Sequence, residues 1–411
     1  MDFDKKTSKG KHLAMILALL PVGLLVGVVC GIVGSAFSHS VAFVTDLRAL
    51  KPWILYFLPL GGAASVLIYK LFRVTGTKTD DAVHSAHTDK KVSSRLLPAV
   101  FICSVITHLF GGSAGREGAA LKMGGGIAAL TAKAFKLDER SRRTIALAGM
   151  SGVFAAVFGT PVGAAVFTLE VVRSRSIRWW GFLTSLISGF VAFTVSKALF
   201  VKPERFHIPE LPEISFSVMW KVVLVAVLGG VVSYVFCQSM HGASKLAKKL
   251  LKNDYLRIIV LSVIIVGLTA LLGTTDYNGG GINIIEKIFE CGEVRYEAFA
   301  LKIVFTALTV AAGFKGGEII PAFFVGATFG ASGALLLGLS PAFGAAVGMT
   351  ALFCGVTNCP VATLILSCEM FGVEGIVFYL VSVVLGFLFS GKPSLYDGEK
   401  FPFKSLKNEK V

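Results

Sequence analysis

Two glycine-rich stretches decide the fold: residues 111–126 read GGSAGREGAALKMGGG, and residues 313–330 read GFKGGEIIPAFFVGATFG. Each stretch places one carboxylate, Glu117 or Glu318, after small residues and at the start of an apolar run. An ionisable residue at such a place in a membrane chain is energetically costly and is usually functional. Glycine lets the backbone approach a ligand closely, and the free N–H groups at a helix start attract an anion. The two stretches therefore predict an anion path with protonatable gates.

The composition indicates an integral membrane protein. The chain has 411 residues, of which 54% are hydrophobic and 16% are charged, and its mean hydropathy is +0.75. Soluble domains contain roughly 25% charged residues. The apolar runs lie at residues 13–37, 53–71, 96–109, 144–169, 180–200, 218–237, 258–272, 301–312, 319–339, 342–366 and 373–388. Several approach the roughly 20 residues that cross a bilayer, while others are short or interrupted, as in transporters that bring irregular backbone to a midplane site.

The basic residues indicate the topology rather than a nucleic-acid partner. The net charge is +15, and Lys and Arg are spread over loops and tails at residues 5–12, 90–95, 133–143, 173–178, 245–257 and 392–410. Cytoplasmic loops carry such an excess under the positive-inside rule. The connections at 201–213 and 274–297 are neutral or acidic, which places them outside. We therefore predict a multi-pass protein of the cell (inner or plasma) membrane with both termini in the cytoplasm and no nucleic acid as partner.

Metal and enzyme motifs are missing from the sequence. None of the seven Cys residues forms a CxxC pair or a Cys/His set with metal-site spacing. His84 and His87 lie near Asp80 and Asp81 but lack a suitably spaced fourth ligand, so a solvated helix face is the preferred interpretation. The chain also lacks HExxH and GxxxxGK[ST]. These observations predict no metal, no cofactor and no enzymatic activity, and they disfavour an intramembrane enzyme, the alternative from another class.

An internal repeat organises the chain. The offset is 199 residues for three corresponding pairs and 201 for a fourth: Gly149/Gly348, Pro161/Pro360, Glu170/Glu369 and Glu117/Glu318. Repeats of this kind place the substrate site between the two halves, at broken helices. The predicted division is a cytoplasmic tail at 1–12, a first membrane repeat at 13–202, a connection at 203–214, a second repeat at 215–390, and a pore-lining Tyr segment with a cytoplasmic tail at 391–411.

The sequence GREG at 115–118, with GGEIIP at 316–321 and Tyr396, resembles the CLC family of chloride channels and anion/proton antiporters. The resemblance covers roughly residues 13 to 396. It implies an all-α integral membrane fold of two inverted structural repeats, with about eighteen tilted or broken helices. It also implies that each protomer holds its own pore and that two protomers form a homodimer in the bilayer.

Several departures from the usual family pattern resemble the fluoride-exporting branch. Ala119 replaces the proline that usually follows GREG, and the usual pore-serine segment GSGIP is not recognisable at 75–81, which read TGTKTDD. Glu318 replaces an apolar residue, and Val171 stands where many chloride antiporters have an internal glutamate. In that branch a threonine commonly stands where this chain has Ile320. The resemblance thus implies a secondary transporter that exports fluoride in exchange for protons. A chloride/proton antiporter or a chloride channel is the alternative.

Glu117 is the predicted gate. In its ionised form the carboxylate can occupy the anion's place among the N–H groups around Gly118 and Ala119, and in its protonated form it releases that place. This competition would couple anion and proton movement. The alternative is a helix N-terminal carboxylate that interacts only with the helix dipole.

The remaining predicted site residues follow from the resemblance. Glu318 would be a second protonatable group whose neutral form donates to fluoride, or a structural residue at its helix start. Thr79, Tyr396 and Phe323 are predicted pore contacts, with solvated loop, membrane-interface and core-packing roles as their respective alternatives. The full predicted anion-binding set is Gly115, Arg116, Gly118, Ala119, Ile319, Ile320, Tyr396, Thr79 and Phe323.

Overall fold

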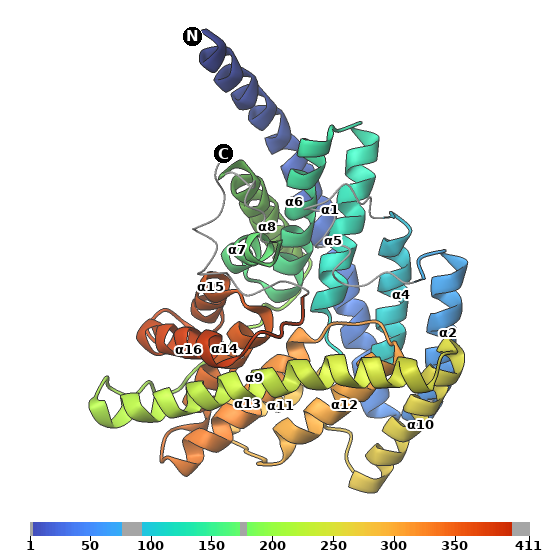
Figure 1. Cartoon of the computed structure of the whole chain (residues 1–411), viewed down its shortest axis with the longest axis vertical. Helices are drawn as coiled ribbons and strands as arrows, with labels where there is room; N and C mark the ends of the chain where they lie inside the picture. Colours follow the sequence, from blue (N-terminus) through green and yellow to red (C-terminus); the bar gives the residue numbers. More distant parts are fainter. Residues whose placement is uncertain (1–2, 76–92, 173–178, 397–411) are drawn as a thin grey trace.

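The computed structural model describes residues 3–75, 93–172 and 179–396, and this part of the chain is almost entirely helical (Figure 1). It contains fifteen α-helices and one 3-10 helix, whereas the family resemblance implied about eighteen helices. The elements are α1 (Phe3–Leu50), η1 (Pro52–Phe57), α2 (Leu58–Leu71), α4 (Leu96–Leu109), α5 (Glu117–Ala134), α6 (Glu139–Phe158), α7 (Pro161–Val172), α8 (Trp179–Ala198), α9 (Phe216–Leu250), α10 (Asp254–Leu272), α11 (Ile282–Cys291), α12 (Ala298–Ala312), α13 (Ile319–Leu336), α14 (Pro341–Thr357), α15 (Pro360–Phe371) and α16 (Ile376–Phe389). The predicted all-α class is confirmed.

The helices differ widely in length, as the interrupted apolar runs predicted. Among the described residues, six spans are long and apolar enough to cross a membrane: Leu19–Leu50, Pro52–Leu71, Gly181–Ala198, Phe216–Leu250, Asp254–Leu272 and Ile319–Leu336. Six further apolar helices have only 10–17 residues: α4, α7, α12, α14, α15 and α16. Helices that stop inside the membrane leave free backbone groups there, which suits a binding site at the centre of a transporter.

The order of the helices repeats between the two halves. The series α4 to α8 corresponds to the series α12 to α16, and the corresponding helices α5 and α13 each follow one of the two glycine-rich stretches. The short helices α7 and α15 each begin at a proline, Pro161 and Pro360. The predicted connection at 203–214 lies between α8 and α9. We propose the same division into two repeats for the folded chain.

Two carboxylates make reciprocal contacts across the repeats. Glu369 at the end of α15 accepts hydrogen bonds from the N–H groups of Val162 (3.1 Å) and Gly163 (2.7 Å) at the start of α7. Glu170 at the end of α7 makes the corresponding contacts at the start of α15, at 3.2 and 2.6 Å. Such an exchange, in which each partner offers the same surface, is the signature of a two-fold relation. The two halves are thus related by a pseudo-two-fold axis, as inverted repeats require.

Replacing Glu170 or Glu369 by Gln is expected to destabilise the fold by about 1–3 kcal/mol for each substitution. The amide loses the charge that favours a helix N-terminus, and its NH2 group opposes one of the two N–H donors that the carboxylate accepts. Thermal unfolding of the detergent-solubilised protein measures the effect. Glu374→Gln, at an exposed site near Glu369, is the matched control. Unfolding temperatures equal to that of the parent protein would show that the reciprocal contacts contribute nothing.

Glycines bring the helices of each repeat into backbone contact. A Cβ atom at Gly326 on α13 would lie 2.8 Å from the carbonyl oxygen of Gly348 on α14, which no side chain tolerates. Gly124 on α5 and Gly149 on α6 make the corresponding contact in the first repeat. Small residues allow this approach of helices in membranes. As a consequence the first three turns of α5 are buried on all sides, so the start of this helix lies inside the protein.

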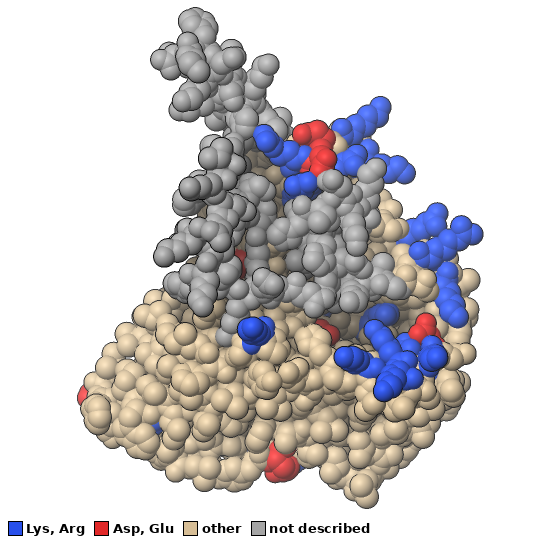
Figure 2. All heavy atoms as spheres, viewed as in Figure 1, with Lys and Arg blue, Asp and Glu red and all other residues tan. Residues whose placement is uncertain are grey.

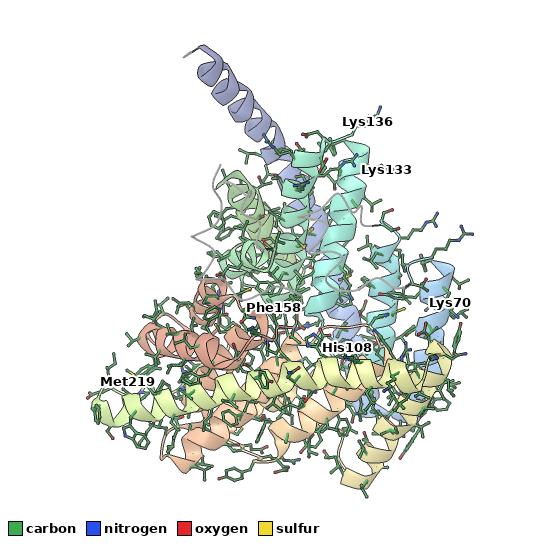
Figure 3. All side chains as sticks on the ribbon, in the orientation of Figure 1. Lys70, His108, Lys133, Lys136, Phe158 and Met219 are labelled. Carbon is green, nitrogen blue, oxygen red and sulfur yellow. The ribbon has the colours of Figure 1, made fainter. Side chains whose placement is uncertain are left out.

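The basic side chains are unevenly distributed over the visible face of the molecule. In Figure 2, most Lys and Arg lie at the upper right and along the right side, while the larger surface at the lower left is mostly uncharged. Lys133 and Lys136 lie at the end of α5 and Lys70 lies at the end of α2 (Figure 3). This distribution agrees with the loops that the sequence assigns to the cytoplasm. The orientation of the termini stays a prediction.

Candidate functional site

The two glycine-rich stretches meet at their backbones. The N–H of Gly115 donates to the carbonyl oxygen of Gly317 (2.6 Å), and the N–H of Gly317 donates to the carbonyl oxygen of Gly115 (2.8 Å), which forms an isolated antiparallel bridge. Helix α5 begins two residues after this bridge at Glu117, and α13 begins at Ile319. The starts of both helices therefore converge on one place at the interface between the repeats.

Glycine is required for this approach. A Cβ atom at Gly118 would lie 3.0 Å from the carbonyl oxygen of Gly316 and 3.0 Å from the Cα of Gly317. A larger residue at any of these positions would push the two helix starts apart. The predicted site residues Gly115 and Gly118 thus act through the backbone, since their lack of a side chain brings N–H donors of both halves together.

The carboxylate of Glu117 lies between the two helix starts. Glu117 is completely buried, its Oε1 accepts from the N–H of Arg116 at 3.0 Å, and its Oε2 accepts from the N–H of Ile320 at 3.2 Å. The first donor belongs to the first repeat and the second donor to the second repeat. Helix N-termini supply partial positive charge and unpaired N–H groups, which suit an anion. The carboxylate therefore occupies a position with the chemistry of an anion site.

The donors differ from those that the sequence suggested. We expected the Glu117 carboxylate to lie among N–H groups around Gly118 and Ala119, but Arg116 and Ile320 supply the donors. The reason is the backbone bridge between Gly115 and Gly317, which brings the start of α13 close enough for the N–H of Ile320 to reach the Glu117 carboxylate. Ile320 lacks the hydroxyl that a threonine would offer, yet its main-chain N–H contributes directly.

The side chain of Arg116 has a second carboxylate partner. Its guanidinium forms an ion pair with Glu204, and the two side chains are only 16% and 11% exposed. Glu204 lies in the connection between the repeats, for which the sequence predicts no functional residue. A lone acidic residue in a loop carries no pattern that distinguishes it from a solvated one, so the sequence offered no signal for this contact.

An aromatic series runs from the second helix start to Tyr396. The ring of Phe323, one turn after Ile319 on α13, lies 5.0 Å from that of Phe353 on α14. The Phe353 ring lies 5.8 Å from that of Phe167 on α7, and Phe167 lies 6.1 Å from Tyr396. Tyr396 is buried, with 6% of its surface exposed, so the membrane-interface alternative for this residue is excluded. Its pore role stays a prediction.

Two further rings extend this series. Phe158 at the end of α6, labelled in Figure 3, meets Phe323 edge to face at 6.3 Å. Phe154 stacks on Phe158 at 4.5 Å. Neither residue belongs to the site that the sequence predicts. A usable signal existed for Phe154, because it corresponds to Phe353 at the same 199-residue offset as the repeated motifs.

Glu318 and Ile319 mark the second helix start. Glu318 occupies the N-cap position of α13, is half-buried, and lies within electrostatic range of Cys237 on α9. Ile319 is buried. The structure thus places Glu318 at the start of α13, beside the site. Its role as a second protonatable group stays a prediction.

The structure does not test the predictions for Thr79 and for the His84/His87 pair. Thr79 and the His84/His87 pair fall outside the residues that the structure describes. Within the described residues there is no group of three or more His, Cys, Asp or Glu side chains that could hold a metal ion.

Two reciprocal helical repeats with converging helix starts and a buried carboxylate at their interface define a membrane transport protein. The sequence profile described as "Voltage gated chloride channel" matches residues 61–391. The chain belongs to this family, the CLC family. It is therefore a transport protein of that family and not an enzyme.

Individual relatives agree with this assignment. A "Chloride/fluoride channel protein" of Pseudomonas syringae pv. tomato is 32% identical over 396 residues, which cover 94% of this chain and 87% of the relative. An "H(+)/Cl(-) exchange transporter ClcA" of Vibrio campbellii is 26% identical over 433 residues and covers 96% and 91%, respectively.

Solved structures share the fold. The crystal structure of a CLC-type fluoride/proton antiporter has a TM-score of 0.87 and 29% sequence identity, covering 93% of this chain and 97% of that one. A slow cyanobacterial Cl-/H+ antiporter has a TM-score of 0.79 at 21% identity and covers 91% and 95%, which supports the fold alone. The CLC-like fold class is thereby confirmed.

Proposed function

We propose that this protein is a fluoride/proton antiporter in which Glu117 is the gate. The observation that carries the proposal is the position of the Glu117 carboxylate, fully buried and hydrogen-bonded to N–H donors from both repeats. A permeating anion needs the same donors, so the ionised carboxylate and the anion exclude one another. Protonation removes the negative charge of Glu117 and frees the donors.

Proton coupling follows from this competition. When a proton neutralises Glu117, the side chain leaves the N–H groups of Arg116 and Ile320, and an anion takes its place. When the anion departs, the site again favours an ionised carboxylate, and the proton is released. Each anion that passes thus requires a protonation cycle of one side chain, which couples the two fluxes in opposite directions.

Two observations support fluoride over chloride as the transported anion: the position of Glu318 and the descriptions of the relatives. Fluoride is small and strongly hydrated, so hydrogen-bond donors must replace its water when it enters the site. A protonated Glu318 beside the second helix start supplies such a donor, where an apolar residue supplies none. The relatives at 29% and 32% identity are both described with fluoride. Exchange of chloride for protons is the second candidate, because the 26% identical relative is described as a chloride exchanger.

The remaining binding roles rest on the same geometry. Gly115, Gly118 and Ala119 shape the first helix start, and Ile319 and Ile320 shape the second. We further propose that Phe323 and Tyr396 line the path beyond the gate. On the family resemblance alone, we also propose a hydroxyl contact from Thr79. In the bilayer, we propose a homodimer in the cell membrane with one pore per protomer and both termini in the cytoplasm.

The test is anion efflux from liposomes that contain the purified protein. We expect fluoride efflux to exceed chloride efflux, and we expect proton uptake to accompany fluoride, because exchange moves the two ions in opposite directions. Fluoride- and chloride-selective electrodes and an external pH electrode record the three fluxes on the same vesicles. Chloride efflux equal to or faster than fluoride efflux would favour the chloride alternative. Fluoride efflux without proton movement would indicate a channel.

A further inference from the structure

The Arg116 residue of the glycine-rich stretch contacts two carboxylates with two different groups. Its main-chain N–H donates to Glu117, and its guanidinium pairs with Glu204. The positive charge of Arg116 also acts on Glu117 through space. One arginine therefore links the buried carboxylate at the helix starts to a carboxylate of the connection between the repeats.

We propose that Glu204 is a positioning residue for the gate: it holds and neutralises the guanidinium of Arg116, and so keeps Glu117 able to accept a proton. This inference rests on the proposed role of Glu117. It assigns to the connection between the repeats a part in the transport reaction that neither the repeat pattern nor the family motifs indicate.

The position of Glu204 is fixed by its surroundings. Its main-chain N–H donates to the carbonyl oxygen of Phe158 at the end of α6 (2.9 Å), and the next-but-one residue, Phe206, donates to the carbonyl oxygen of Met370 on α15 (2.9 Å). The Phe206 ring is buried and stacks on Phe289 of α11 at 4.9 Å. The connection is thereby attached to both repeats and to α11. The carboxylate of Glu204 is presented to Arg116 by this attachment.

The charge of Glu204 limits the electrostatic effect of Arg116 on Glu117. An unneutralised guanidinium beside Glu117 would stabilise the ionised carboxylate and so oppose its protonation. The negative charge of Glu204 cancels much of that field at short range. Without it, Glu117 would remain ionised to a lower pH and would block the donors that the anion needs.

Other charged groups lie near the Arg116–Glu204 ion pair and contribute to the local electrostatic field. Glu286 on α11 lies within electrostatic range of both Glu204 and Arg116. His108 at the end of α4, labelled in Figure 3, lies within electrostatic range of Arg116. Burial raises the pKa of the Glu204 carboxyl, but the guanidinium of Arg116 opposes this increase, and their ion pair favours the ionised carboxylate. The local charge is thus set by several residues, but the ion pair with Arg116 is the contact that Glu204 makes at hydrogen-bond distance.

The proposal is tested by the pH profile of fluoride efflux from liposomes. Glu204→Gln is expected to move the external pH of half-maximal efflux about half to one unit toward acid, because the charge of Arg116 is no longer cancelled. Arg116→Gln is expected to move it in the opposite direction. A looser structure cannot produce opposite shifts at the two ends of one ion pair. Glu210→Gln, at an exposed site of the same connection, should leave the profile unchanged.

The outcomes separate this inference from the proposed gate. If Glu117→Gln removes the pH dependence but Glu204→Gln leaves the midpoint where it was, the gate stands and the role of Glu204 is rejected. If Glu117→Gln keeps the pH dependence of the parent protein, the proposed function itself fails. If Glu204→Gln does not yield folded protein, the double variant Arg116→Gln/Glu204→Gln, which leaves no unpaired charge, should restore folding and a midpoint near that of the parent. A midpoint equal to that of Arg116→Gln alone would overturn the proposal.

Discussion

Replacing Glu117 by Gln is expected to reduce proton uptake by at least about a hundredfold, to the background of empty liposomes, while fluoride efflux continues. Gln has the size of Glu and retains an acceptor for the N–H of Ile320, so the helix starts should keep their arrangement. It cannot ionise. The side chain therefore loses both the negative charge that competes with the anion and the proton that it carries. Simultaneous recording with fluoride and pH electrodes measures the two fluxes.

The comparison requires a carboxylate that lies far from the site. Glu139→Gln at the start of α6 is suitable, because its side chain is 59% exposed and its ion partner is the neighbouring Arg143. Proton uptake by this variant should equal that of the parent protein. If the Glu117→Gln protein took up protons at the parent rate, the coupling would have to reside in another group, and Glu318 would be the next candidate.

The repeat was predictable from the sequence because specific side chains make its repeated contacts. Glu170 and Glu369 keep a constant offset with the prolines that start their helices, and the structure shows why, since each carboxylate caps the helix of the other repeat. Because the same contact is made twice in the structure, the residues that make it occur twice in the sequence. The same logic applies to the two glycine-rich stretches, whose glycines are required at one shared point of approach.

The identity of the donors was not predictable in this way. The N–H of Ile320 is a main-chain group that every residue except proline possesses, so no residue type in the sequence identifies it as a donor. Glu204 reaches Arg116 only because the connection is attached to α6, α11 and α15. The aromatic series around Phe323 depends on rings from three helices that are far apart in sequence. Each of these contacts exists through tertiary packing and has no local pattern.

Glu318→Ile is expected to lower the ratio of fluoride efflux to chloride efflux by roughly ten- to a hundredfold. The estimate follows from losing one hydrogen bond to a charged partner, which is worth about 1.5–3 kcal/mol. Fluoride depends more on this donor than chloride does, because fluoride gives up more hydration on entering. Both effluxes are measured on one batch of liposomes with ion-selective electrodes.

A second substitution distinguishes the donor from the charge. Glu318→Gln keeps an NH2 group that can donate to fluoride but removes the ionisable proton. If Glu318 acts as a donor, the Gln variant should retain much of the fluoride preference that the Ile variant loses. If Glu318 only caps α13, both variants should lose stability and neither should change the ratio. Glu290→Gln, at an exposed site on α11, controls for a general effect of charge on anion entry. A higher ratio of fluoride to chloride efflux in Glu318→Gln than in Glu318→Ile would therefore show that the side chain at position 318 acts as a donor to fluoride.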